Sequence, residues 1–251
     1  MILPRLRRAV LLLLLTAALP ALADEPLRFG VGLFQPDREK NDATYRPLAD
    51  YLAGKLGRKV QLRTVDSWEG LAKSLASGET DIALLGPWGY VLANRNAGAQ
   101  AVATILYDGK PTYQFLTMGI PDPEKFFGKV VYTKHQAIET QVTRGELDAG
   151  ADYDRNRNAM IEQGLIKAAD SKIIWTSAPL PNDAFAVSAD LARDKALVAR
   201  LKAALEQAGE AAKAKPGLLP PHYTGFVASD DALYKPIRDA GLATGKLQPR
   251  P

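Results

Sequence analysis

The sequence predicts a two-lobed α/β fold in which a smaller lobe is inserted into a larger one. Two strand-helix-strand units follow one another between residues 27 and 85, and a similar alternation returns between residues 130 and 163. Consecutive units of this kind form parallel sheets. Two further extended segments, residues 106–117 and 175–188, are expected to cross between the lobes. We therefore expect a ligand cleft at the junction of the two lobes.

The first 23 residues are predicted to be a secretory signal peptide. Three arginines in the first eight residues precede an apolar run from Ala9 to Leu19, and Ala21-Leu22-Ala23 offers a small-residue cleavage site. The run has 11 residues, whereas a helix that spans a bilayer needs about 20. The chain has no cysteine, so it has no thiol for a lipid anchor. We expect an exported, periplasmic protein of residues 24–251.

The first lobe is expected to contain residues 24–108 together with residues 189–251. Its opening strand, residues 27–34, is largely apolar, and leucines then recur at helical spacing over residues 44–56. The same criteria predict, in chain order, a strand over 59–65, a helix over 68–77, a short buried strand over 81–85, a tight turn at 86–89, a helix from 90, and strands over 100–106 and 112–117.

The second lobe is expected to be the insertion, residues 109–188. The predicted elements are strands over 130–133 and 148–151, helices over 137–144 and 155–163, and returning extended segments over 172–176 and 185–188. A long helix over residues 195–215 then belongs to the first lobe again. The remaining residues, 216–251, are rich in Pro and Gly and are expected to pack along that lobe.

The balance of charges argues against a nucleic-acid partner. The formal net charge is +4, and it falls to +1 without the three arginines of the signal peptide. The rest of the chain has no basic stripe of the kind that tracks a phosphate backbone.

The usual signatures of catalysis and cofactor binding do not occur in the sequence. There is no dinucleotide glycine fingerprint, phosphate-binding loop, nucleophile elbow or His-Glu-x-x-His motif. The two histidines, His135 and His222, have no partner at metal-ligand spacing. We predict no enzymatic activity, no cofactor and no metal.

Two segments of the first lobe carry candidate ligand contacts. Thr44 is able to cap a helix whose free N–H groups would attract an anion, and the neighbouring Tyr45 has a hydroxyl to donate. Tyr90 follows the turn Gly86-Pro87-Trp88-Gly89, at a strand end where a cleft is expected. For both tyrosines a purely structural role is the alternative, because aromatic residues under loops are often core residues.

The second lobe and the return crossing carry further candidates. Thr133 and His135 follow a predicted strand, which is where ligands of α/β proteins bind. A carboxylate in a cleft accepts a hydrogen bond from an oxyanion that carries a proton, as no basic residue can. The candidate carboxylates are Asp148, Asp152, Asp154 and Asp183. A capping or surface role for the histidine, and a solvated face for the carboxylates, are the alternatives.

Several ordered segments together resemble a known family. They are Tyr45–Leu52, Gly78–Pro87, Val130–His135, Gly145–Ala151, Ser177–Asp183, Gly225-Phe226 and Asp230–Arg238. The resemblance that these segments mark extends over nearly all of the chain after the signal peptide. They resemble the phosphate, phosphite and phosphonate substrate-binding proteins of ABC importers, which have the type II periplasmic binding-protein fold.

The resemblance implies particular roles for the candidate residues. The family's tyrosine contacts correspond to Tyr45 and Tyr90, its cleft histidine to His135, and its acidic acceptors to Asp183 and the segment from Asp152 to Asp154. It further implies a monomer that closes on a small oxyanion by hinge motion and presents it to an inner-membrane ABC permease.

The chain departs from the family pattern after the first crossing. Family members carry a strand and a Ser/Thr-rich helix start at this point. In this chain Thr117 is followed by residues 118–127, which contain no Ser and no motif of that kind. The second lobe is therefore expected to be shortened by about one βα unit. We expect that phosphorus oxyanions bind weakly or not at all, and that any bound oxyanion lies against Thr133, Lys134 and His135.

The sequence thus predicts a periplasmic solute-binding protein of an ABC importer for phosphate, phosphite or phosphonate. One alternative is a ligand-binding partner of a membrane sensor. Another is a truncated family member with weak or no oxyanion binding.

Overall fold

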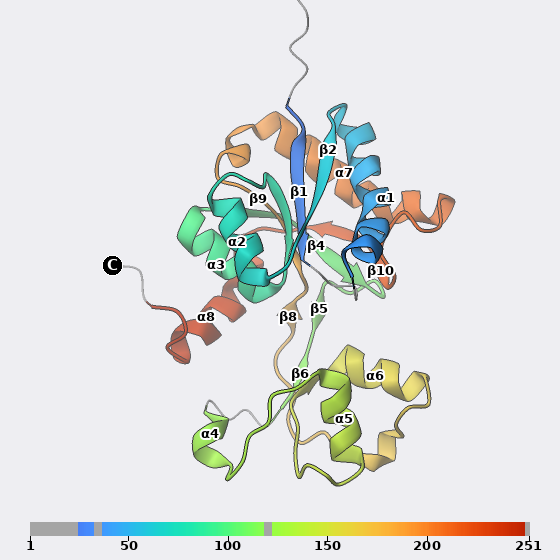
Figure 1. The fold of residues 1–251 in the computed structure, drawn as a ribbon, viewed down its shortest axis with the longest axis vertical. Helices are drawn as coiled ribbons and strands as arrows, with labels where there is room; N and C mark the ends of the chain where they lie inside the picture. The colour runs from blue at the N-terminus through green and yellow to red at the C-terminus, as the bar shows by residue number, and fades with distance from the viewer. Residues whose placement is uncertain (1–24, 33–36, 118–121, 249–251) are drawn as a thin grey trace, which may run out of the picture.

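Two lobes joined by a pair of strands form the molecule (Figure 1). The computed structural model describes residues 25–32, 37–117 and 122–248. The predicted signal peptide, residues 1–23, lies outside the described residues. None of the helices within the described residues combines the length and the apolarity that crossing a bilayer requires.

The first lobe is built on a six-stranded mixed sheet. The strands are β1 (Leu27–Gly32), β2 (Val60–Val65), β3 (Ile82–Leu85), β4 (Gln100–Tyr107), β9 (Ala184–Val187) and β10 (Tyr223–Ala228), in the order β10-β4-β9-β3-β1-β2. The strand β1 pairs in parallel with both β2 and β3, as the two crossovers predict. The other neighbouring pairs are antiparallel.

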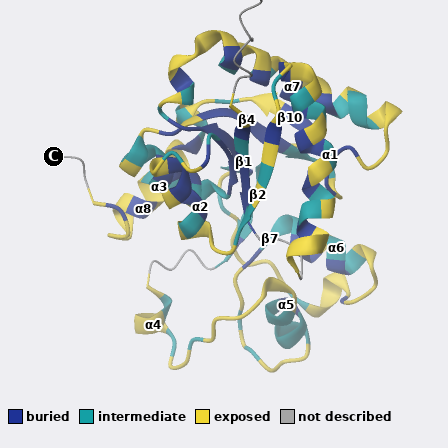
Figure 2. Ribbon diagram, turned by 45° about the horizontal axis from the view of Figure 1, so that its top comes forward, coloured by how far each residue is buried: buried dark blue, intermediate teal, exposed yellow. Residues whose placement is uncertain are grey.

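Helices cover both faces of this sheet and bury two apolar layers (Figure 2). One face is covered by α1 (Arg38–Leu56) and α7 (Lys195–Ala214). The other face is covered by α2 (Trp68–Ala76), α3 (Pro87–Ala97), the short η3 (Asp231–Tyr234) and α8 (Lys235–Ala243). A further short helix, η2 (Leu191–Arg193), precedes α7. The C-terminal segment therefore completes the first lobe.

The helix α1 begins earlier than the sequence predicts. Asp37 caps it by accepting a hydrogen bond from the backbone N–H of Lys40 at 2.8 Å. Thr44 lies inside the helix, where its hydroxyl donates to the carbonyl of Lys40 at 2.8 Å. The prediction that Thr44 caps the helix was wrong, because the first two turns are polar and carry little of the apolar periodicity that marks a helix. Pro47 consequently lies within the helix and not in its first turn.

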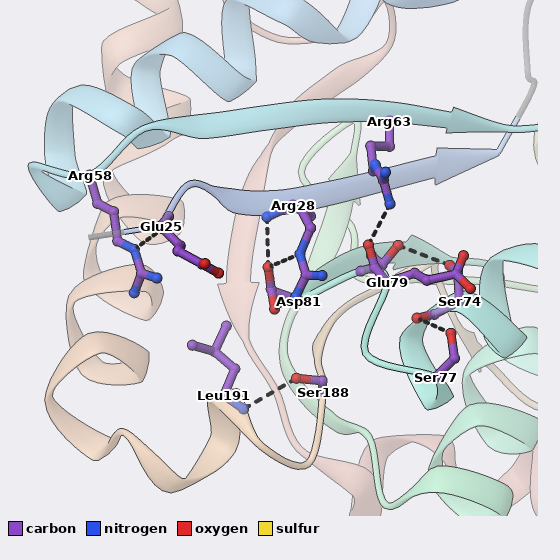
Figure 3. Close-up of polar contacts among 11 residues, drawn as sticks. Glu25, Arg28, Arg58, Arg63, Ser74, Ser77, Glu79, Asp81, Ser188 and Leu191 are labelled. Atoms are coloured by element: carbon purple, nitrogen blue, oxygen red, sulfur yellow. Dashed lines mark hydrogen bonds and ion pairs between the residues drawn. The ribbon is translucent and has the colours of Figure 1, made fainter. Parts of the chain in front are cut away.

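An ion pair fixes the amino ends of the central strands, far from the junction of the lobes (Figure 3). The Nε and Nη2 atoms of Arg28 donate to the two carboxylate oxygens of Asp81 at 2.8 and 2.7 Å. The backbone N–H of Arg28 donates to the same carboxylate at 2.8 Å. The carbonyl of Asp81 accepts from the backbone N–H of Ser188 at 2.9 Å. This bidentate pairing ties β1 to the loop before β3 and to the end of β9.

The second lobe follows two short crossing strands. The strand β5 (Thr112–Tyr113) pairs with β8 (Leu180–Pro181), and β6 (Phe115–Leu116) pairs with β7 (Asp152–Tyr153). The helices of this lobe are α4 (Pro123–Phe126), α5 (His135–Thr143), α6 (Asp154–Glu162) and the short η1 (Ala168–Asp170). The strand β9 belongs to the large sheet, so the chain has returned to the first lobe before residue 189, where the sequence places the boundary.

Three strands that the sequence predicts do not form in this lobe. Among the described residues, 130–133 and 148–151 are in no strand, and residues 172–176 contribute only an isolated bridge between Leu116 and Thr176. Most side chains in 131–136 and 172–176 are exposed. An alternating pattern becomes a strand only where a neighbouring strand supplies hydrogen bonds and a core to cover one face.

Candidate functional site

Five tyrosines gather where the two lobes meet. We call them the tyrosine cluster: Tyr45 of α1, Tyr107 of β4, Tyr113 of β5, Tyr153 of β7 and Tyr223 of β10. The rings of Tyr107 and Tyr223 are 5.1 Å apart, and those of Tyr113 and Tyr153 are 6.2 Å apart. The cluster thus combines residues of the first lobe, a crossing strand and the second lobe.

One cation of the second lobe lies among these rings. Arg155, in the first turn of α6, places its guanidinium carbon 3.7 Å from the ring centre of Tyr107. The same atom is 5.7 Å from the ring centre of Tyr113 and 5.9 Å from that of Tyr153. Its Nη1 atom is buried and has no hydrogen-bond partner among the described residues. Stacking holds the guanidinium in place and leaves N–H groups free to donate.

One carboxylate lies at the centre of the cluster. Asp183 immediately precedes β9, and its carbonyl accepts hydrogen bonds from the N–H of Ile105 at 3.2 Å and from the hydroxyl of Thr104 at 3.1 Å. Burial raises the pKa of Asp183 to about 6, although the charge of Arg155 acts in the opposite direction. The backbone of Asp183 is therefore held in place, and its side-chain carboxyl group gains a proton as the pH falls through about 6.

The tyrosines of the cluster keep their protons. Burial raises the pKa of Tyr45 and of Tyr113 to about 12, and the negative charge of Asp183 adds to that effect. Burial and the same carboxylate also raise the pKa of Tyr107, Tyr153 and Tyr223. All five hydroxyls are therefore able to donate hydrogen bonds at physiological pH.

Together these groups suit a small anion that carries a proton. Arg155 supplies positive charge and N–H donors, and the tyrosines supply neutral hydroxyl donors. Asp183 accepts a hydrogen bond when charged and donates one when protonated. Among the described residues, no three His, Cys, Asp or Glu side chains are arranged to hold a metal ion.

Two of the sequence-predicted site residues belong to this arrangement. Asp183 is at its centre, and Tyr45 is one of the five tyrosines. The Tyr45 side chain is buried, and its hydroxyl oxygen is 3.3 Å from that of Tyr223. This contact leaves Tyr45 in the wall of the site, oriented by its neighbour.

The structure places Tyr90 elsewhere, in the core of the first lobe. Its side chain is fully buried, and its ring packs 4.5 Å from that of Tyr234. Its hydroxyl donates to the carboxylate of Asp231 at 3.2 Å and accepts from the N–H of Ala101 at 3.2 Å. The prediction of a ligand contact fails because the first turn of α3 directs Tyr90 under the sheet, away from the junction.

The candidates of the second lobe form a separate group beside the cluster. Nδ1 of His135 is 2.9 Å from Oδ1 of Asp152, whose other oxygen accepts from Asn156 at 2.7 Å. The Asp152 side chain is buried, so it is not exposed to the junction. His135 reaches the cluster only through an edge contact with Tyr153, at 4.8 Å between ring centres. Thr133 is exposed, and no strand precedes it.

Sequence reasoning missed Arg155 and four of the five tyrosines. Signals were nevertheless present: Tyr107 and Tyr113 flank the turn of the first crossing, and Tyr153 and Arg155 lie within and directly after the acidic segment 152–154. In that segment only the carboxylates are predicted to contact a ligand. Aromatic residues beside both crossings of a two-lobed fold are the pattern that would have found the site.

This architecture is that of two-lobed solute-binding proteins, with candidate ligand-binding groups supplied by both lobes at their junction. Residues 33–118 and 118–234 match the family of periplasmic phosphonate substrate-binding proteins of ABC transporters. The chain belongs to this family. The match confirms the resemblance and the fold that the sequence predicts, and the family is one of binding proteins and not of enzymes.

Known relatives are distant in sequence but share the fold. The chain is 21% identical over 196 residues to the phosphate-import protein PhnD of Mycolicibacterium smegmatis; the match covers 58% of this chain and 61% of that protein. A phosphonate-transporter binding protein of Pseudomonas aeruginosa has a TM-score of 0.63 at 18% identity, covering 89% of this chain and 88% of that one. PhnD1 of Prochlorococcus marinus, solved with methylphosphonate, has a TM-score of 0.65 at 14% identity, covering 88% and 98%.

Proposed function

We propose that this chain is a periplasmic substrate-binding protein that delivers a small phosphorus oxyanion to the permease of an ABC importer. Membership of the phosphonate-binding family supports this role. Relatives whose names specify phosphate import or a methylphosphonate complex support the ligand class.

The observation that carries the proposal is that a guanidinium N–H group of Arg155, in the second lobe and unpartnered among the described residues, lies near enough to the Asp183 carboxyl group of the first lobe to act on it electrostatically. The buried Nη1 of Arg155 has no partner among the described residues, and the charge of Arg155 acts on the Asp183 carboxyl group. An oxyanion between them satisfies the donor with a charged oxygen. A hydroxyl on the same ligand satisfies Asp183.

The carboxylate also sets the preference among tetrahedral anions. Above pH 6, Asp183 is predominantly charged. A fully deprotonated anion such as sulfate then meets a repelling carboxylate with no proton between them. Phosphate, phosphite and phosphonates retain an exchangeable proton near neutral pH and form a hydrogen bond at the same position.

The ligand class is tested by calorimetric titration and thermal unfolding of the purified protein. Phosphate, phosphite and methylphosphonate are compared with sulfate at about pH 7.5. A ligand present at 100 times its dissociation constant adds about 2.7 kcal/mol to the free energy of unfolding. We expect stabilisation by at least one phosphorus ligand and none by sulfate. Equal binding of sulfate contradicts the proposed role of Asp183, and no binding of any phosphorus ligand by the folded protein contradicts the proposed function.

A growth experiment separates import from sensing. A strain that lacks this protein is expected to lose growth on its ligand as sole phosphorus source, and the permease must be required in the same way. Normal growth of that strain, with altered gene expression alone, favours a sensor partner.

A further inference from the structure

A second concave surface lies between the first lobe and the crossing strands. We call it the apolar groove; it has a volume of about 580 Å³. Its apolar lining comprises Trp68, Trp88, Leu92, Tyr113, Phe115, Leu180 and Ile237. The charged residues among its described lining are Glu69 and Lys246. A groove of this size and composition is typical of sites that bind small organic molecules.

Two tryptophans form its walls at the starts of neighbouring helices. Trp68 is the first residue of α2 and remains 42% exposed, and Trp88 is the second residue of α3 and remains 37% exposed. A glycine makes room for one of the rings. A Cβ at Gly241 of α8 would lie 2.5 Å from the Trp88 ring, whereas one at Gly86 would lie at an ordinary contact distance of 3.8 Å from the Trp68 ring. The two rings are thus held in place at the groove while keeping accessible surface.

The groove shares a residue with the tyrosine cluster. Tyr113 lines the groove, and its ring centre is 5.7 Å from the guanidinium of Arg155. On the groove side, the Tyr113 ring is 5.4 Å from the ring of Phe115. A single aromatic ring therefore separates the anion-binding groups from an apolar surface.

We propose that the apolar groove binds the organic substituent of a phosphonate whose charged group lies between Arg155 and Asp183. This inference rests on the proposed function and specifies its substrate class: phosphonates with an aryl or branched alkyl substituent. An apolar substituent gains by leaving water for a surface of tryptophan and phenylalanine rings. Inorganic phosphate has no such substituent and leaves the groove unfilled.

Phenylphosphonate and methylphosphonate serve as the probes, because they share the charged group and differ in the substituent. Calorimetric titration of the purified protein is expected to give a phenylphosphonate affinity roughly tenfold or more above that of methylphosphonate. Equal affinities overturn the inference and leave the proposed function intact. Failure of both probes while phosphate or phosphite binds also overturns the inference and leaves the proposed function intact. Failure of all four ligands to bind the folded protein overturns the proposed function itself.

Three variants locate the substituent. Trp68→Ala removes one wall, and Ala240→Phe places a ring in the groove from an exposed position of α8. Trp175→Ala is the matched control, because Trp175 is 44% exposed and lines a different cavity, within the second lobe. The affinity ratio of the two probes is expected to fall to near one in the first two variants and to persist in the third. A ratio that persists in both groove variants, while their melting temperatures show that they are folded, overturns the assignment of the groove.

Discussion

The guanidinium carbon of Arg155 lies 3.7 Å from the ring centre of Tyr107, so a cation of the second lobe packs on an aromatic residue of the first. The contact joins lobes that are otherwise connected by the short crossing strands β5 and β8. It places a charged donor beside the tyrosine cluster. The predictions below test the groups around this contact.

Replacing Arg155 by methionine is expected to weaken phosphorus-oxyanion binding by about one to two orders of magnitude, because a hydrogen bond to a charged group contributes about 1.5–3 kcal/mol. Methionine retains a long side chain for packing on Tyr107. Calorimetric titration measures the loss. The control is Arg144→Met, since the Arg144 side chain is 69% exposed in the same lobe and away from the cluster. Unchanged affinity in R155M removes Arg155 from the site.

Asp183→Asn is expected to reduce the change of the free energy of unfolding with pH. The pKa of Asp183 is raised from 3.8 to about 6, so the fold favours the protonated form. The resulting contribution to stability is fully present below about pH 4 and is lost as the pH rises through about 6. Asparagine stays neutral, so the variant should gain stability relative to the wild type with rising pH, by about 3 kcal/mol at most. Thermal melts of both proteins across this range measure the difference, and parallel curves contradict the prediction.

Glu139→Gln is expected to change the pH dependence of folding at a higher pH than Asp183→Asn does. Burial, together with the neighbouring Asp152 carboxylate, raises the pKa of Glu139 to about 7, and Arg157 acts in the opposite direction. The wild type should therefore lose stability as the pH rises through about 7, and the glutamine variant should not. The control is Glu146→Gln, because the Glu146 side chain is 52% exposed in the same lobe. If E139Q loses stability through about pH 7 as the wild type does, the titrating group is another residue.

A pair of conservative variants separates the two places proposed for the oxyanion. The sequence predicts that it lies against Thr133, Lys134 and His135, whereas we propose from the structure that it lies beside Asp183 and the tyrosine cluster. Thr133→Ala, at an exposed position, is expected to leave affinity unchanged. Tyr45→Phe removes a hydroxyl that orients Tyr223 and should weaken binding by about 0.5–1.5 kcal/mol. Calorimetric titration measures both affinities. Weaker binding by Thr133→Ala together with unchanged binding by Tyr45→Phe would favour the location beside Thr133, Lys134 and His135.

The first lobe was predictable because its signals are local. The apolar periodicity of β1, α2 and β3 is contained in short stretches of chain, and each element buries the face that the pattern indicates. The strands expected over residues 130–133 and 172–176 failed because strand formation depends on a partner that the sequence does not reveal. Tyr45 and Asp183 were predicted from their motifs, and the structure places both in the candidate site. Arg155 was missed because its partners, Tyr107 and Tyr113, are distant in sequence and meet it only through the fold.

The close approach of Gly241 to Trp88 joins α8 to the wall of the apolar groove. The helix α8 packs on α3 and lines the groove, yet it follows the last strand of the sheet. Under the role proposed for the groove, substitutions in residues 235–248 would change which substituents are accepted without altering the sheet, the crossing strands or Arg155 and Asp183.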